Sequence, residues 1–198
     1  MTGASAARAP LTGEGFARIL AALGRQGEED VAWSEGLGLP ANADDFAMEA
    51  IWVLCNSGMK HTVARIIQGR VLDAIRSGRP VREAFAHPGK ASAMQHFWDR
   101  REEQFEGFLE AEDRLSYLAG LPWIGKITKY HLAKNCGIDC AKPDVHLDRL
   151  ARLEGADAHA MCARLAGETG YRIATVDVVL WRSCATGVLD SRTGRVAA

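Results

Sequence analysis

No stretch of the sequence contains 18 consecutive apolar residues, so the sequence predicts no transmembrane helix. The first ten residues, MTGASAARAP, lack the apolar segment of a secretory signal peptide, and we expect a cytoplasmic protein. The chain also has no excess of positive charge, because 24 Lys and Arg residues are balanced by 25 Asp and Glu residues, for a net charge of −1. Nucleic-acid binding would therefore require a local basic face.

Cysteines are few and scattered along the chain. Their number is odd, which argues against a disulfide framework. Cys136 and Cys140 are four residues apart, but no second Cys or His pair follows closely at ligand spacing, so neither a zinc site nor an iron–sulfur cluster is expected. We interpret the cysteines as small buried residues in a reducing cytosol and expect no metal. The five are Cys55, Cys136, Cys140, Cys162 and Cys184.

Alternation of apolar and polar residues is too short anywhere to build a sheet, whereas apolar residues recur at helical spacing along most of the chain. We therefore predict an all-α fold of about eight to ten helices, a two-lobed helical bundle in one domain over residues 13–198, after a flexible tail over residues 1–12. A turn is expected at His87-Pro88-Gly89. Helices are expected within residues 13–27, 45–58, 61–78, 79–86, 94–120 (with a possible break near 112), 144–155, 157–170 and 172–189.

The stretch LPWIG, residues 121–125, predicts a hairpin between two helices. Such a hairpin leaves backbone N–H groups unpaired, and together with the positive end of the following helix they form an anion site. Gly125 gives the backbone the freedom for a phosphate to approach closely, and Lys126 and Lys129 add positive charge. The hairpin is thus able to hold a DNA backbone without reading its sequence. The alternative is an ordinary helix–helix turn capped by glycine.

A second motif, KPDVHLDRL, follows about twenty residues after Gly125. Pro143 moves Lys142 out of helical geometry, so the chain enters the next helix abruptly, with Asp144 at its start. We expect Asp144 to be the N-cap of that helix. A carboxylate there is also held ionised by the helix N-terminus, which suits it to stabilise a developing cation.

These two motifs resemble those of the helix-hairpin-helix DNA glycosylase superfamily. The family pattern is Leu-Pro-Gly-Ile/Val-Gly, a helix, a loop, and then Val-Asp-Thr-His-x-x-Arg. This chain has LPWIG at residues 121–125 and PDVHLDR at residues 143–149, within a motif-bearing segment of about residues 113 to 155. Asp144 matches the catalytic aspartate of the family, and His146 and Arg149 match the residues that usually follow it.

The resemblance implies a partner, double-stranded DNA containing a damaged or modified base, and a monomeric protein associated with the nucleoid. No cofactor is required, although hairpins of this type can hold a structural monovalent cation against a phosphate. It implies that Asp144 assists hydrolysis of an N-glycosidic bond after the nucleotide is extruded from the duplex. The DNA-binding residues that it implies are Leu121, Trp123, Ile124, Gly125, Lys126, Thr128, Lys129 and His146.

Two departures from the family pattern are informative. Bifunctional members carry a Schiff-base lysine two residues after the second hairpin glycine, where this chain has Ile127. Lys126 is adjacent but lies about 100° around the helix, so a monofunctional enzyme without a lyase step is implied. Trp123 stands at the first hairpin glycine. Either it packs against the DNA backbone or a flanking sugar, or it marks a branch whose hairpin has drifted from phosphate binding.

The stretch WVLCNSGMKHT, residues 52–62, is the second candidate wall of a base pocket. In the resembled family this region lies at the DNA-facing cleft, so Asn56, with Ser57 and Lys60, is a candidate for filling or probing the gap left by the base. Alternatively, Asn56-Ser57-Gly58 only ends the helix. Glu49 lies seven residues before Asn56 in a strongly apolar helix and is either a pocket acid or a salt-bridged structural residue.

Three functions remain open from the sequence. The first is a monofunctional DNA glycosylase. The second is an enzyme of the same fold that remodels a modified base in DNA by group transfer, as some virus-associated branches of this fold are thought to do. The third is a non-catalytic DNA-binding module that retains the fold.

Overall fold

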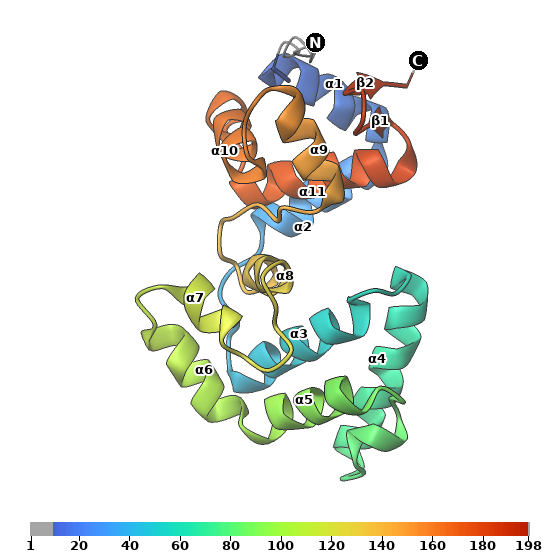
Figure 1. Ribbon diagram of the computed structural model, residues 1–198, viewed down its shortest axis with the longest axis vertical. Helices are drawn as coiled ribbons and strands as arrows, with labels where there is room; N and C mark the ends of the chain where they lie inside the picture. Colours follow the sequence, from blue (N-terminus) through green and yellow to red (C-terminus); the bar gives the residue numbers. More distant parts are fainter. Residues whose placement is uncertain (1–9, 198) are drawn as a thin grey trace, which may run out of the picture. The chain divides into compact units, whose positions relative to one another are not determined.

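The computed structural model describes residues 10–197 and shows an all-α protein, as predicted (Figure 1). Over this part of the chain there are eleven α-helices, one 3-10 helix and one two-stranded hairpin. None of these helices is long and apolar enough to cross a membrane. The elements are α1 (Gly13–Leu23), α2 (Arg25–Glu35), α3 (Ala43–Asn56), α4 (His61–Arg76), η1 (Val81–Glu83), α5 (Pro88–Asp99), α6 (Arg101–Glu110), α7 (Arg114–Ala119), α8 (Thr128–Asn135), α9 (Val145–Leu153), α10 (Ala158–Thr169), α11 (Ile173–Thr186), β1 (Leu189–Asp190) and β2 (Arg195–Val196).

The described chain divides into two compact units. Residues 38–137 form the central unit, and residues 10–37 with 138–197 form the terminal unit. Each unit has its own hydrophobic core, so two segments distant in sequence, at the two ends of the chain, fold together. The assignment of both units to one domain over residues 13–198 stays a prediction.

The central unit is built around α3, which contacts α4, α5, α6 and α8 (Figure 1). Asn42 caps the start of α3 by accepting from the Asp45 N–H at 2.9 Å. The helix is apolar on nearly every side because neighbours surround it, and Phe46 stacks on Phe108 of α6 with ring centroids 5.1 Å apart. Its C-terminal carbonyls are capped from α5, whose Lys90 Nζ donates to Leu54 O and Ser57 O.

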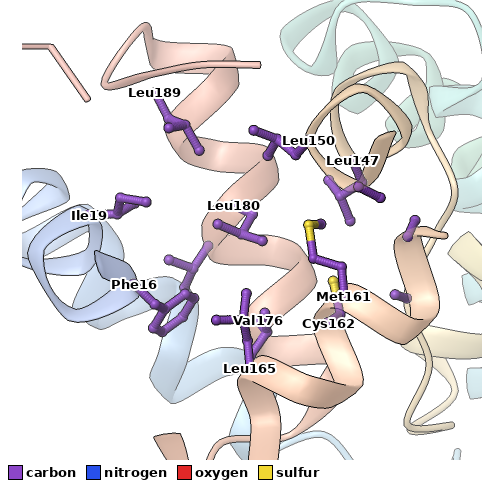
Figure 2. Packing of buried hydrophobic residues seen from close by; sticks show 14 residues of the cluster. Phe16, Ile19, Leu147, Leu150, Met161, Cys162, Leu165, Val176, Leu180 and Leu189 are labelled. Atoms are coloured by element: carbon purple, nitrogen blue, oxygen red, sulfur yellow. The ribbon is translucent and has the colours of Figure 1, made fainter. Parts of the chain in front are cut away.

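The terminal unit packs α1, α2, α9, α10 and β1 around α11. Figure 2 shows the side chains of its core meeting on both sides of α11. The valine-rich sequence of α11 is typical of a strand, but its length and burial make it a helix, as predicted. The labelled core residues are Phe16, Ile19, Leu147, Leu150, Met161, Cys162, Leu165, Val176, Leu180 and Leu189.

The region after α4 differs from the prediction. The turn expected at His87-Pro88-Gly89 is the start of α5, with Pro88 at the first helical position and His87 Nδ1 accepting from the Lys90 N–H at 3.3 Å. Proline favours this position because the N–H that it lacks has no partner there anyway. The long helix expected over residues 94–120 is three helices, with an unexpected break at Arg100 and a second break at residues 111–113, where the sequence allowed one.

Two elements of the terminal unit were not predicted. The charged helix α2 follows α1 after a single residue, Gly24, whose φ of 55° turns the chain. The hairpin of β1 and β2 pairs Leu189 with Val196 and Asp190 with Arg195. Each of its strands has two residues, which is too short for an alternating pattern to be recognised.

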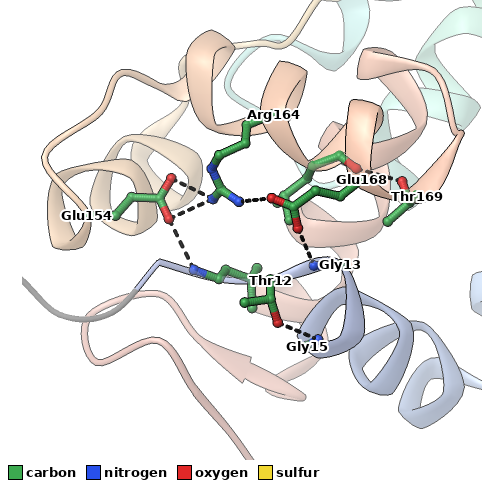
Figure 3. A network of polar contacts seen from close by, with 9 residues as sticks. Thr12, Gly13, Gly15, Glu154, Arg164, Glu168 and Thr169 are labelled. Atoms are coloured by element: carbon green, nitrogen blue, oxygen red, sulfur yellow. Dashed lines mark hydrogen bonds and ion pairs between the residues drawn. The ribbon is translucent and has the colours of Figure 1, made fainter.

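The last residues of the expected tail are held by hydrogen bonds, whereas residues 1–9 of it lie outside the described residues. Leu11 N donates to Glu154 Oε2 at 3.1 Å, and Thr12 caps α1 by accepting from the Gly15 N–H. Figure 3 shows the network behind this contact, in which Arg164 bridges Glu154 and Glu168. The start of α1 is thereby joined to α9 and α10.

Arg164→Met is expected to lower the free energy of unfolding by about 2 kcal/mol, because it leaves the Glu154 carboxylate buried without its cation. The Glu154 side chain is only 6% exposed. The Arg164 side chain is 35% exposed, and this partial contact with solvent reduces the expected loss of stability. Urea unfolding followed by circular dichroism measures the change. The matched control is Arg18→Met, whose pair with Glu14 is exposed on both sides and is worth less than about 0.5 kcal/mol. Equal losses in the two variants would contradict the expectation.

Candidate functional site

The hairpin is a tight turn in which Ile124 N donates to Leu121 O at 3.1 Å. Pro122 is its second residue, and Trp123, the third, has φ of 62°. Trp123 is the only non-glycine residue with positive φ in the described chain. A turn with proline second and positive φ third is of type II and normally requires glycine there. Trp123 thus adopts a conformation that glycine normally occupies in such a turn.

The backbone after the turn offers unpaired donors. Gly125 O accepts from Lys129 N at 3.0 Å as α8 begins, and Ile127 precedes that helix without a side-chain cap. Between residues 10 and 197 no acceptor is found for the N–H groups of residues 125–128. Residues 125–127 are exposed, so these donors can reach an anion.

Positive charge surrounds these donors. Residues 114–138 contain no Asp or Glu but include Lys126, Lys129 and Lys134. Lys126 is exposed, and Lys129 is half-buried with its Nζ 5.1 Å from the centre of the Tyr130 ring. This segment therefore carries local positive charge, although the whole chain is slightly acidic and the charge of Lys129 also acts on Asp113.

The Trp123 side chain packs on the first turn of α5. Its ring centroid lies 5.0 Å from that of His87, at an interplanar angle of 81°. A Cβ placed on Gly89 would be 2.3 Å from Trp123 Cζ2, so only glycine leaves room for the indole. The residue nevertheless remains 53% exposed.

The other expected hairpin contacts differ in exposure. Ile124 is 3% exposed and its N–H donates to Leu121 O, so it supports the turn from within the central unit and does not offer the DNA contact that the resemblance implies. Leu121 and Thr128 are half-buried. The carbonyl oxygens of Leu121, Gly125 and Ile127 already accept hydrogen bonds, and the monovalent cation at the hairpin stays a prediction.

Asp144 is the N-cap of α9, as predicted. Its Oδ1 accepts from the N–H groups of His146 at 2.9 Å and Leu147 at 3.1 Å, whereas no partner for Oδ2 is found among the described residues. The preceding loop is anchored by Asp177 of α11, whose Oδ2 accepts from Lys142 N at 2.5 Å. Because one oxygen is fixed by two donors, the other has a defined position and is available for chemistry.

The surroundings of Asp144 and His146 include two side chains, Ser191 and Cys184, that the sequence did not place there. His146 Nδ1 lies 3.1 Å from Oγ of the buried Ser191, in the turn of the β-hairpin, so His146 is tied to the C-terminal end of the chain. Burial, with the negative charges of Asp144 and Asp190, raises the pKa of the Cys184 thiol to about 12. Cys184 therefore stays protonated and is not a nucleophile at neutral pH.

The segment from Asn56 to Lys60 forms the exit of α3. Ser57 N donates to Val53 O, Met59 N donates to Asn56 O, and Gly58 has φ of 80°. This is the helix-ending geometry that the sequence allowed. Asn56 and Ser57 are half-buried and Lys60 is exposed, so the amide of Asn56 and the ammonium group of Lys60 still reach the surface of the central unit.

Glu49 is a half-buried carboxyl on α3. Asn135 Nδ2, at the end of α8, donates to its Oε2 at 2.8 Å. Burial raises the pKa of Glu49 and outweighs the Asn135 hydrogen bond and the Arg65 charge, which both lower it. Glu49 is thus held by an amide, and its proton is retained to higher pH than that of an exposed carboxyl.

The predicted residues fall into two groups. The hairpin, Glu49 and the exit of α3 belong to the central unit, whereas Asp144 and His146 belong to the terminal unit. In the described chain no group of three or more His, Cys, Asp or Glu residues is arranged to hold a metal ion. Comparison with protein-family models, with curated proteins and with solved structures finds no match to this chain.

Proposed function

We propose that this protein is a monofunctional DNA glycosylase with a helix-hairpin-helix fold. The observation that carries the proposal is the hairpin backbone, in which Trp123 keeps the positive φ of a glycine and residues 125–128 keep unpaired N–H groups. A turn that had only to connect two helices has no need of a strained tryptophan. The unpaired N–H groups that follow it support a ligand for this backbone, and the lysine-bearing segment, which lacks Asp and Glu, suits a phosphate.

In the proposed binding mode the hairpin grips one phosphate of the DNA backbone. The N–H groups of residues 125–128 donate to its oxygens, and Lys126 and Lys129 supply charge. This contact positions the strand without reading its sequence. Because few phosphates are neutralised, we expect modest affinity that falls with salt concentration.

Asp144 stabilises the reaction in the proposed mechanism. As the C1′–N bond of the extruded nucleotide breaks, its electron pair leaves with the base, and the sugar gains oxocarbenium character. The Oδ2 atom of Asp144 is the oxygen that stabilises this positive charge and orients a water for attack at C1′. The water then loses a proton to the carboxylate or to solvent. The departing base takes up a proton from solvent.

Ile127 makes the proposed enzyme monofunctional. Its side chain is 45% exposed at the position where a lysine would attack C1′, and an alkyl group cannot form a Schiff base. The product is then an abasic site in an intact strand.

Duplexes carrying a panel of damaged and modified bases test the proposal. After incubation with the protein, we expect alkali to cleave at one class of lesion, and no cleavage without alkali. A change in the mass of the base without an abasic site would instead support group transfer. Binding without either change, across the whole panel, would support a non-catalytic module and contradict the proposal.

A further inference from the structure

Trp123 combines a strained backbone with an exposed ring. Bulky residues rarely adopt positive φ, and a glycine at this position would form the same turn without strain. Burial does not compensate for the strain, because the residue is 53% exposed. The backbone geometry alone therefore does not explain why a tryptophan occupies the turn.

The ring is held in one orientation. His87 meets it edge-on and Gly89 lies against its six-membered ring, so contacts with α5 fix the indole on one side. Three other tryptophans, Trp52, Trp98 and Trp181, each have a guanidinium group over the ring, at 4.4 to 5.1 Å from its centre. No such cation covers Trp123 among the residues that the structure describes. An oriented and uncovered aromatic surface remains.

The surroundings select a planar ligand that carries negative charge. The two segments that meet at Trp123, residues 84–98 and residues 114–138, both lack Asp and Glu. The unpaired N–H groups begin two residues after Trp123, at Gly125. A nucleotide offers both features together, because its base has a π-face and its phosphate is an anion.

We propose that Trp123 is a stacking platform for an unpaired base of DNA, next to the phosphate held by residues 125–128. This inference rests on the proposed DNA-binding role of the hairpin. In an intact duplex both faces of every base are covered by neighbouring bases, whereas an unpaired base exposes a face to an aromatic side chain. The protein accordingly prefers DNA with unstacked bases, such as bulges and gaps, over continuous duplex.

Two oligonucleotides of equal length and charge isolate the stacking contribution. One is single-stranded oligothymidine, and the other is the same strand with every base replaced by hydrogen. Fluorescence anisotropy with the full chain is expected to show about tenfold tighter binding of the strand that carries bases. Trp123→Gly, which fits the turn without strain, is expected to abolish this preference and to leave binding of the base-free strand unchanged.

Two controls separate the inference from the proposed function. Trp33→Ala removes a tryptophan of similar exposure from the terminal unit and is expected to keep the preference. Lys126→Gln combined with Lys129→Gln is expected to weaken binding of both strands. Equal affinity of wild-type protein for the two strands, no binding of either, or a preference that survives Trp123→Gly would overturn the inference. If wild-type protein binds the two strands equally, or if the preference survives Trp123→Gly, a loss of affinity in the lysine variant would still support phosphate binding by the hairpin.

Discussion

Replacing Asp144 with asparagine is expected to lower the rate of base release by about 10²- to 10³-fold while changing the free energy of unfolding by less than about 1 kcal/mol. Asparagine is as good an N-cap as aspartate, so its side-chain oxygen can still accept from His146 N and Leu147 N. The negative charge is lost, and with it the stabilisation of the cationic sugar. The measurement is the single-turnover rate of abasic-site formation, together with urea unfolding of the same protein.

Asp157→Asn is the matched control for this substitution. Asp157 caps α10 in the same way, with its carboxylate accepting from Ala160 N at 2.8 Å, but it is not part of either motif. We expect it to release base at the wild-type rate. If Asp144→Asn also kept the wild-type rate, Asp144 would be a cap and nothing more, and the catalytic role would be wrong.

Ile127→Lys is expected to convert the protein into one that forms a covalent Schiff base with DNA. The amine attacks C1′ of the sugar as the base leaves, and a borohydride reagent then reduces the imine to a stable link. Wild-type protein is expected to give no trapped product. Because only the neutral amine attacks and an exposed lysine has a pKa near 10.4, the yield should rise about tenfold for each pH unit up to about pH 10. Gel electrophoresis of the trapped complex measures it.

A charge-matched variant shows whether position or charge matters. Ile127→Lys combined with Lys126→Ile moves the lysine by one residue and leaves the net charge of the hairpin unchanged. It is expected to trap DNA, whereas wild-type protein, whose Lys126 stands one residue earlier in the turn before α8, is not. Trapping by wild-type protein would contradict the monofunctional assignment.

Much of the local structure was predictable from the sequence. Helical periodicity located α3, α4, α10 and α11, and the cap at Asp144 followed from a proline and an aspartate before an amphipathic run. The hairpin was expected from LPWIG because turn residues act over a few positions. The start of α5 was also a local signal, but proline at a first helical position was interpreted as a turn.

Contacts between distant residues were not predictable. Asp177 holds the loop before Asp144 across 35 positions, Ser191 meets His146 across 45, and Asn135 meets Glu49 across 86. Nothing in the sequence around these polar residues indicates which distant residue each of them contacts. Only the packing of α11, the β-hairpin and α8 supplied the partner, and no periodicity encodes such pairings.

The sequence by itself determined the all-α class, the hairpin and the capped aspartate, because helix periodicity, turn chemistry and capping depend on neighbouring residues. Tertiary structure alone decided how Trp123 is held. The residue stands where a glycine was expected, and the sequence left open whether the hairpin was still intact. Packing on Gly89 and His87 holds its ring, and the buried Ile124 anchors the turn, so the strained conformation persists. Strain of this kind survives only where surrounding contacts over-determine the backbone, and those contacts come from a helix 35 residues away in the chain.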